Sequence, residues 1–380
     1  MHGKPIIGVI GLSHLGVVAS AAFASLGFNV IAVDSDSKTV AQLAQGVCIV
    51  PEPGLEELLR ACVPLIQFTD TFTKLASCDI VFLAKDTPVT IGNEMDLLPL
   101  YALLDAGFVH VKSDADCIVM SQVPASFTRG VMQRLKEKHP SFTGNILYWV
   151  ETLVIGDAVN RFLKPERLIF GSQNPSEAFG SRLQEVLACF TCPVLRMSFE
   201  SAELTKAAIN LYLAASVTYA NTLANICEAV GADIREMLPA LRLDKRIGQH
   251  AYIKPGLGFS GGHLERDLVM LGKLAKEFGA RMEFLDAIQH ESSLRYEWLR
   301  QHLNASIFSA GRRPKLAIWG IAYKKNTDST WGAPSLRVID DFASRADIVA
   351  YDPLAKLPAE SLAKQVPDAY AALLEADALV

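Results

Sequence analysis

The N-terminal segment constrains the fold more than any other part of the chain. Ile6–Ile10 is a short apolar, β-branched run that predicts a strand, and the glycine-containing turn Gly11–Gly16 follows it. An alanine-rich helical pattern comes next, and Asn29–Val33 predicts a second strand that leads to Asp34. A dinucleotide site needs this layout, because the turn brings a pyrophosphate to a helix N-terminus and a carboxylate binds the ribose hydroxyls. No Arg adjoins Asp34, so we expect NAD rather than NADP.

Further strand–loop units follow the same pattern. Asp79–Ala84 predicts a buried strand leading to Lys85–Pro88, and Asp116–Ser121 predicts another leading to Gln122–Pro124. In a parallel sheet both polar loops lie at the carboxyl edge, where ligands bind. Two more runs predict strands of the same domain: Leu147–Val150, which leads to Glu151, and Arg167–Gly171. We therefore expect residues 1–197 to form one doubly wound α/β domain that binds NAD.

A long helix is predicted after this domain. Ser201–Val230 contains neither Gly nor Pro, and its apolar residues recur at helical spacing. Such a helix spans two domains or forms a subunit interface, so both a homodimer and an intramolecular spine are open. Lys206 and Asn210 are four residues apart and share one face of it. We expect residues 198–303 to form a central helical domain.

The segment Lys254–Asp267 is rich in glycine and ends in polar residues. Four glycines predict a loop whose backbone can approach a ligand, and we expect a helix only from Leu268. His263 lies in this loop and is either a catalytic group or a residue that packs or caps locally.

A second, smaller α/β domain is predicted over residues 304–380. Lys315–Trp319 and Asp347–Ala350 have the pattern of buried strands, and Gly320 follows the first of them as a glycine does in the first domain. The chain stops where another strand begins, so we expect this domain to be truncated.

Composition excludes several classes of protein. Net charge is −5, from 36 basic and 41 acidic residues, with no basic run that would bind nucleic acid. No apolar stretch is long enough to span a membrane, and the seven cysteines are scattered in apolar surroundings. Cys189 and Cys192 have CxxC spacing but no second pair, so we interpret them as core residues and expect no metal site. We expect a cytoplasmic protein.

The order of motifs resembles the nucleotide-sugar 6-dehydrogenases, the family of UDP-glucose and GDP-mannose dehydrogenases. The matching residues extend over nearly the whole chain. They are Gly11–Gly16, Asp34, Glu52–Glu57, Thr87-Pro88, Ser121, Val123-Pro124, Glu151, Ala202–Lys206, Asn210, Arg246–Gly248, Pro255–Gly258, Gly261, Asp267, Lys324, Thr327-Asp328 and Tyr351–Pro353.

The resemblance implies two Rossmann-like domains joined by a long helix, a homodimer, and NAD-dependent oxidation of a nucleotide-sugar for polysaccharide biosynthesis. It implies that Lys206 and Asn210 stabilise an oxyanion, that Asp267 and Glu151 handle protons, and that His263 stands at the family's cysteine position. Cofactor contacts are expected from Gly11, Ser13, His14, Leu15, Gly16, Asp34, Lys38, Thr87, Pro88 and Gln122. Substrate contacts are expected from Glu151, Lys206, Asn210, Arg246, Gly256, Gly258 and Lys324.

The chain departs from the family around this site. Family members carry a cysteine that holds the aldehyde stage, whereas this chain has His263-Leu264 there and no cysteine after Cys227. Other expected family residues are replaced by Gln122, Ile155, Lys254 and Trp331, and Ser13 replaces the middle glycine of the first turn.

Three hypotheses follow from these departures. The chain is an oxidoreductase that performs one hydride step, or a full four-electron dehydrogenase, or a binding protein that has lost catalysis. Lys206, Asn210, Glu151 and Asp267 are the groups that a single alcohol–carbonyl step needs, which favours the first.

Overall fold

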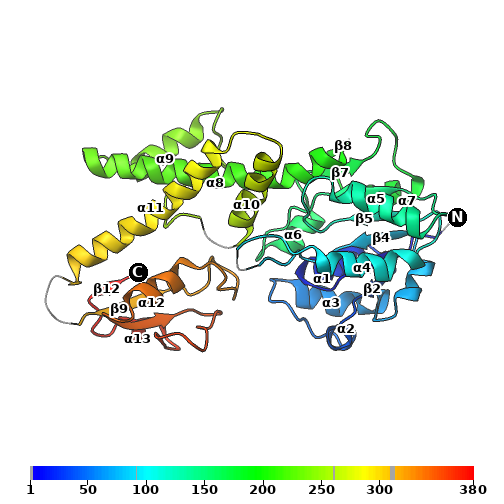
Figure 1. Cartoon of the computed structure of the whole chain (residues 1–380). Helices are drawn as coiled ribbons and strands as arrows, with labels where there is room; N and C mark the ends of the chain where they lie inside the picture. Colours follow the sequence, from blue (N-terminus) through cyan, green and yellow to red (C-terminus); the bar gives the residue numbers. More distant parts are fainter. Residues whose placement is uncertain (1–2, 91, 260–261, 309–312) are drawn as a thin grey trace. The chain divides into compact units, whose positions relative to one another are not determined.

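The structure is a computed structural model that describes residues 3–90, 92–259, 262–308 and 313–380, without the side chains of residues 262 and 263 (Figure 1). It contains two compact units, Met1–Lys206 and Ala207–Val380. None of the described helices has the length and apolar character of a membrane span. The division into three domains stays a prediction.

An eight-stranded sheet forms the centre of the first unit. Its strand order is β3-β2-β1-β4-β5-β6-β7-β8, which is the doubly wound arrangement that the sequence predicts. The strands are β1 (Ile7–Ile10), β2 (Val30–Val33), β3 (Ile66–Thr69), β4 (Ile80–Leu83), β5 (Asp116–Val119), β6 (Ile146–Trp149), β7 (Leu168–Ser172) and β8 (Val194–Ser198).

One pairing in this sheet differs from a purely parallel arrangement. Strand β7 runs antiparallel to β6, with Tyr148 opposite Gly171, and then pairs in parallel with β8. An apolar run has the same pattern in either direction, so the sequence does not predict the reversal. Strand β8 was not predicted either, because its side chains are partly or fully exposed.

Helices cover both faces of this sheet. One face packs on α1 (His14–Ser25), α2 (Ser37–Ala44), α3 (Leu55–Cys62), α6 (Ala158–Leu163) and α7 (Ser181–Leu187). The other packs on α4 (Leu98–Gly107), α5 (Phe127–Lys138) and the first turn of α8 (Phe199–Val230). Short 3₁₀ helices η1 (Val63–Leu65), η2 (Phe72–Ser77) and η3 (Phe108–His110) complete the unit.

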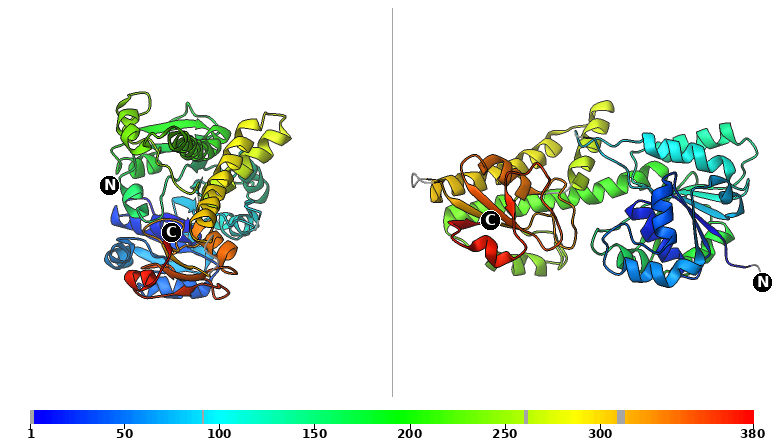
Figure 2. Two further views of the ribbon diagram at one scale, coloured as in Figure 1. Left: turned by 90° about the vertical axis from the view of Figure 1, so that its left-hand side faces the viewer. Right: turned by 90° about the horizontal axis from the view of Figure 1, so that it is seen from below.

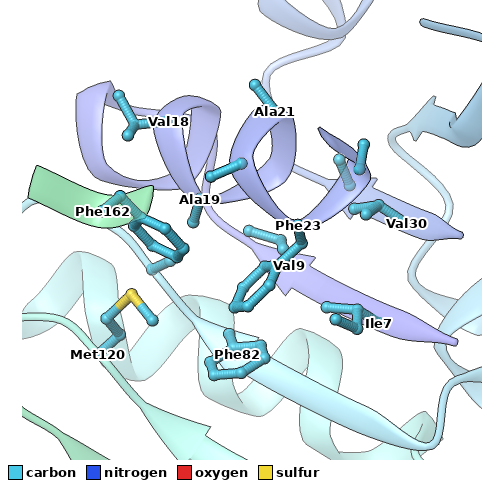
Figure 3. Packing of buried hydrophobic residues seen from close by; sticks show 14 of the residues in the cluster. Ile7, Val9, Val18, Ala19, Ala21, Phe23, Val30, Phe82, Met120 and Phe162 are labelled. Carbon is cyan, nitrogen blue, oxygen red and sulfur yellow. The ribbon is translucent and has the colours of Figure 1, made fainter. Parts of the chain in front are cut away.

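Helix α1 packs directly on the middle of the sheet (Figure 3). Its Phe23 is fully buried and stacks on Phe82 of β4 with ring centroids 4.8 Å apart. Phe162 of α6 meets the Phe23 ring edge-on, with ring centroids 5.2 Å apart. This aromatic packing fixes the C-terminal half of α1 on the sheet. The glycine-containing turn at the other end of the helix follows the carboxyl end of β1.

Helix α8 begins in the first unit and continues into the second. It has 32 residues, in agreement with the predicted long helix. Glu203 on its second turn is 1% exposed, and its carboxylate accepts the N–H groups of Ser126 and Thr128 at 2.6 and 2.7 Å. These bonds satisfy the N-terminus of α5 and fix the rotation of α8 about its axis. Burial raises the pKa of Glu203.

The second unit contains helices and a smaller sheet. Its elements are the rest of α8, α9 (Ile234–Leu243), α10 (Gly262–Glu277), α11 (Glu283–Ser306), β9 (Lys315–Trp319), α12 (Pro334–Phe342), β10 (Asp347–Tyr351), β11 (Lys364–Gln365), α13 (Ala369–Leu373) and β12 (Ala378–Leu379). The sheet is parallel, with order β11-β10-β9-β12. One of its faces packs on α11 and α12 and the other on α13. Figure 2 shows α11 in yellow leading to this orange and red sheet.

Gly16 in α1 offers a direct test of this packing. A Cβ added to it would lie 1.7 Å from the carbonyl oxygen of Gly11 and 2.8 Å from that of Ala84. Both atoms belong to the backbone, so we expect Gly16→Ala to lower the free energy of unfolding by about 3 kcal/mol, the upper end for overpacking. Urea denaturation measures this change.

Gly130 in α5 is the matched control, because a Cβ there meets nothing within 4 Å. We expect Gly130→Ala to stabilise the protein by about 0.5–1 kcal/mol through helix propensity. Equal stability of the two variants would contradict the close packing of α1 against Gly11 and Ala84.

Candidate functional site

The first glycine-containing turn joins β1 to α1 with little space around it. Gly11 has φ +95°, and a Cβ there would lie 2.8 Å from Cβ of Lys85, so only glycine fits. Asp34 at the end of β2 is 2% exposed, and its carboxylate accepts the Leu12 N–H at 2.6 Å. The predicted turn and carboxylate therefore meet at one edge of the sheet.

Lys85 and Asp86, which follow β4, also contact this turn or the Asp34 carboxylate beside it. The Lys85 ammonium lies 3.2 Å from the Asp34 carboxylate. The Asp86 carboxylate accepts the Leu15 N–H in the first turn of α1 at 3.0 Å, and the Asp86 N–H donates to Ser13 Oγ at 2.7 Å. The sequence placed this loop at the carboxyl edge but gave no sign of these contacts.

A third carboxylate, that of Glu52, contacts the start of α1. Glu52 is 7% exposed and lies 2.8 Å from Nε2 of His14. It also accepts the N–H groups of Gly156 and Ala158 at 2.9 and 2.8 Å. The buried carboxylate thus joins the start of α1 to the segment before α6.

The remaining predicted cofactor residues lie at the same edge of the sheet. Lys38 is an exposed residue of α2, just after Asp34. Thr87 and Gln122 are buried at the ends of β4 and β5, and Thr87 Oγ1 donates to the Gln122 carbonyl at 2.5 Å. Pro88 follows as an exposed residue. Their contacts with a cofactor stay predictions.

The first unit also brings together two predicted catalytic residues. Lys206 on α8 forms an ion pair with Glu151, which follows β6, at 2.8 Å. The side chains are only 12% and 15% exposed. A second oxygen of Glu151 accepts the Leu153 N–H at 2.8 Å, which fixes the carboxylate.

The second unit brings together the other pair. The Asn210 amide donates to the Asp267 carboxylate at 2.5 Å, and Asp267 is fully buried. Arg266 Nε lies 3.3 Å from the other oxygen of Asp267. Asn210 follows Lys206 by one turn of α8, so the two residues present one face of that helix.

The start of α10 corrects one expectation. The helix begins at Gly262, not after Asp267, so Asp267 projects from a helix. A glycine at the first position of a helix costs little because its N–H needs no partner within the helix, and the glycine count therefore placed the boundary too late. The side chain of His263 lies outside the described residues, and its role stays a prediction.

Helices α8 and α11 hold the loop before α10. The Asn221 side chain accepts the Gly256 N–H at 2.8 Å, and Arg295 Nε donates to the Gly256 carbonyl at 3.0 Å. Gly258 has φ +90°, and a Cβ there would lie 2.6 Å from Ser292 Oγ. The sequence predicted the loop but missed Asn221 and Arg295, because a polar residue within a helix gives no sign of its partner.

Leu257 of this loop also lines a cavity of about 510 Å³ in the second unit. The cavity lies at the carboxyl ends of β9 and β10, and Lys324 and Thr327 line it. Asp352 accepts four backbone N–H groups, from Ile321, Ala322, Leu354 and Ala355. Burial would raise the pKa of Asp352, but these donors hold it below the usual value.

Arg246 differs from the other predicted substrate residues. Its side chain is 89% exposed and pairs with Asp244 at 2.6 Å. It does not line the cavity that holds Leu257 and Lys324. Its contact with a substrate stays a prediction.

Residues 254–259 of the glycine loop contain no cysteine. Cys62, Cys78, Cys117 and Cys227 are buried, and Cys48, Cys189 and Cys192 are partly buried. Burial raises the pKa of Cys78 to about 12 and also raises that of Cys117. Cys189 and Cys192 pack against the first core, as predicted. The described residues contain no cluster of three or more side chains that could hold a metal ion.

Comparisons with known proteins cover almost the whole chain. Models of the UDP-glucose/GDP-mannose dehydrogenase family match three segments: the NAD binding domain over residues 6–191, the central domain over 200–291 and the UDP binding domain over 317–380. The putative UDP-glucose 6-dehydrogenase YtcA of Bacillus subtilis is 30% identical over 376 residues, which cover 98% of this chain and 87% of that protein. The UDP-glucose 6-dehydrogenase of Pseudomonas aeruginosa is 30% identical over 395 residues, with 98% and 86% covered.

Solved structures agree with these matches. A UDP-glucose dehydrogenase from Pyrobaculum islandicum has a TM-score of 0.90 and 27% identity, with 99% of this chain and 89% of that chain covered. A UDP-D-ManNAc dehydrogenase from Pyrococcus horikoshii has the same fold, with a TM-score of 0.81 and 21% identity.

Glu52 provides a test of how the first turn is supported. Glu52→Ala leaves the N–H groups of Gly156 and Ala158 without their acceptor. Each orphaned buried donor costs about 1–3 kcal/mol, so we expect unfolding free energy to fall by roughly 3 kcal/mol. Thermal or urea denaturation measures it.

Glu56→Ala is the control for this variant. Glu56 pairs with Arg60 on an exposed face of α3, and such pairs contribute about 0.5 kcal/mol or less. A Glu52→Ala protein as stable as this control would contradict the supporting role of Glu52.

Proposed function

Because the chain belongs to the UDP-glucose/GDP-mannose dehydrogenase family, whose models match all three of its segments, we propose that it transfers one hydride between the CH–OH group of a nucleotide-sugar and NAD. The observation that carries this proposal is that Lys206 and Asn210, one turn apart on α8, each pair with a carboxylate: Lys206 with Glu151 in the first unit, and Asn210 with Asp267 in the second. Those four groups suffice for an alcohol–carbonyl step.

The first unit binds NAD through residues that fit a dinucleotide. The Gly11–Gly16 turn allows a close approach to the N-terminus of α1, and Asp34 lies beside it to receive ribose hydroxyls. NAD bound there would accept the hydride from the alcohol carbon. We assign cofactor contacts to the residues around this turn and to Thr87 and Gln122.

Lys206 and Asn210 are proposed to stabilise the alcohol oxygen as it loses its proton. The oxygen becomes negative as its proton leaves and stays so until the carbon gives up its hydride, and an ammonium and an amide N–H held in place stabilise that charge. Glu151 orients Lys206 at 2.8 Å and can accept the proton. Asp267 orients the Asn210 amide from a fully buried position.

The nucleotide is proposed to bind in the cavity of the second unit. Leu257 and Lys324 line that cavity, and its residues fall within the segment that matches the UDP binding domain or in the glycine loop. The Lys324 and Lys325 ammonium groups suit a diphosphate. Asn221 and Arg295 hold the glycine loop against it.

The proposed reaction stops after one hydride because the chain has no thiol at the site. A cysteine thiolate adds to an aldehyde and allows the second oxidation through a thioester. This chain has no cysteine after Cys227, and the residues that follow Gly262 are His263 and Leu264. A neutral imidazole would form a labile adduct, so a carbonyl compound or a returned hydride is the expected outcome.

The number of NADH molecules formed per sugar consumed tests this function. We expect one NADH and a carbonyl product for one member of a panel of UDP-, GDP- and dTDP-sugars, measured by absorbance at 340 nm and mass spectrometry. Two NADH and a uronate would replace the proposal with the four-electron dehydrogenase. Binding of a sugar and NAD without turnover would make the chain a binding protein.

Lys206→Met is the variant that assigns the chemistry to α8. Loss of one electrostatic stabiliser costs about 10²–10³ in kcat, while NADH binding should be unchanged. Lys136→Met, at an exposed position of α5, is the control and should retain full activity.

We further propose that α8 forms a homodimer interface. Tyr212, Tyr219, Ile226 and Val230 are 62%, 49%, 53% and 72% exposed on this helix. Their spacing of seven, seven and four residues places them along one side, which two copies related by a two-fold axis can bury together.

Tyr219→Glu should therefore convert a dimer into a monomer, because it places a charge in the apolar contact. Light scattering coupled to size exclusion measures the mass. Leu362→Glu changes an apolar residue that is 79% exposed outside α8 and should leave the mass unchanged. A monomeric parent protein would refute the dimer.

A further inference from the structure

The two groups that a dinucleotide needs in the first unit are already engaged by neighbouring residues of one loop. The Asp86 carboxylate accepts the Leu15 N–H at 3.0 Å in the first turn of α1. The Lys85 ammonium lies 3.2 Å from the Asp34 carboxylate. A pyrophosphate uses the N–H groups of this helix end, and ribose hydroxyls use this carboxylate.

Asp86 and a pyrophosphate compete for the same position. A helix N-terminus attracts one negative group because its first N–H groups have no partner within the helix. Leu15 N–H cannot donate fully to both, and two anions at one helix end also repel each other. The Asp86 carboxylate must therefore move away from the Leu15 N–H before a pyrophosphate can bind at the N-terminus of α1.

The loop allows the Asp86 side chain to leave without moving its backbone. The Asp86 N–H donates to Ser13 Oγ and the Lys85 N–H donates to Ser121 Oγ at 3.1 Å, so the main chain stays fixed. Asp86 itself is exposed, and a rotation about its side-chain bonds carries the carboxylate into water.

We propose that Asp86 is an internal occupant of the pyrophosphate position and thereby sets the affinity of the chain for NAD. Lys85 reinforces this role because its ammonium engages an oxygen of Asp34 that ribose hydroxyls would use. The proposal rests on the proposed function only in taking NAD as the ligand of the first unit, and it is independent of the sugar and of the number of hydrides transferred.

A purely structural role for Asp86 makes a different prediction. If Asp86 only caps α1, its removal lowers thermal stability and leaves NADH affinity unchanged or weaker. If Asp86 competes with the cofactor, its removal raises NADH affinity even though the cap is lost. The direction of the change in affinity separates the two.

The test is NADH binding to the full chain without sugar, followed by NADH fluorescence. We expect Asp86→Gly to lower the Kd by about tenfold, because the occupant is gone, and Asp86→Asn by about threefold, because an uncharged acceptor remains. The proposal is overturned if the Asp86→Gly protein is folded, as judged by circular dichroism, and binds NADH no more tightly than the parent.

Asp233→Gly is the matched control. Asp233 accepts the Arg235 N–H at the start of α9, so it too is a helix-capping carboxylate near a basic residue, but it belongs to the second unit. It should leave NADH affinity unchanged; tighter binding in this variant also overturns the proposal. Because no turnover is measured, failure of sugar oxidation would leave this result intact and would count against the proposed function alone.

Discussion

The Lys206–Glu151 pair of the candidate site depends on the hydrogen bonds that the buried Glu203 carboxylate accepts. This carboxylate ties the second turn of α8 to the N-terminus of α5 and fixes which side of the long helix faces the first sheet. Lys206 comes three residues later, at the right phase to meet Glu151. Asn210 comes one turn after that, where Asp267 receives it. A rotation of α8 would separate Lys206 from Glu151, so this pair depends on the two backbone N–H groups that the Glu203 carboxylate accepts.

Both sheets use the same physical device to make a binding edge. Parallel strands end together, and a glycine after the first strand of each sheet lets the backbone turn sharply: Gly11 has φ +95° and Gly320 has φ +104°. A carboxylate after a neighbouring strand, the buried Asp34 in one case and the partly buried Asp352 in the other, then accepts N–H groups of that turn. The two sheets thus build their binding edges in the same way and differ in the polar residues that line them.

Much of this arrangement could be predicted from the sequence because it depends on local pattern. Glycine turns, apolar strands and a helix without Gly or Pro lie where the pattern places them. Contacts between residues far apart in the chain could not be predicted: nothing in a lone Lys85-Asp86 pair indicates Asp34 and Leu15 as partners, and nothing in Arg295 indicates Gly256. The late boundary for α10 came from counting glycines, although helix ends tolerate them.

The distribution of the thiols has a consequence for how the protein responds to oxidants and electrophiles. Peroxides and alkylating agents react with thiolates, and burial keeps Cys78 and Cys117 protonated. The described glycine loop contains no sulfur atom for such reagents to attack. If sugar oxidation at this loop uses no thiolate, as proposed, reagents that attack thiolates have no target there.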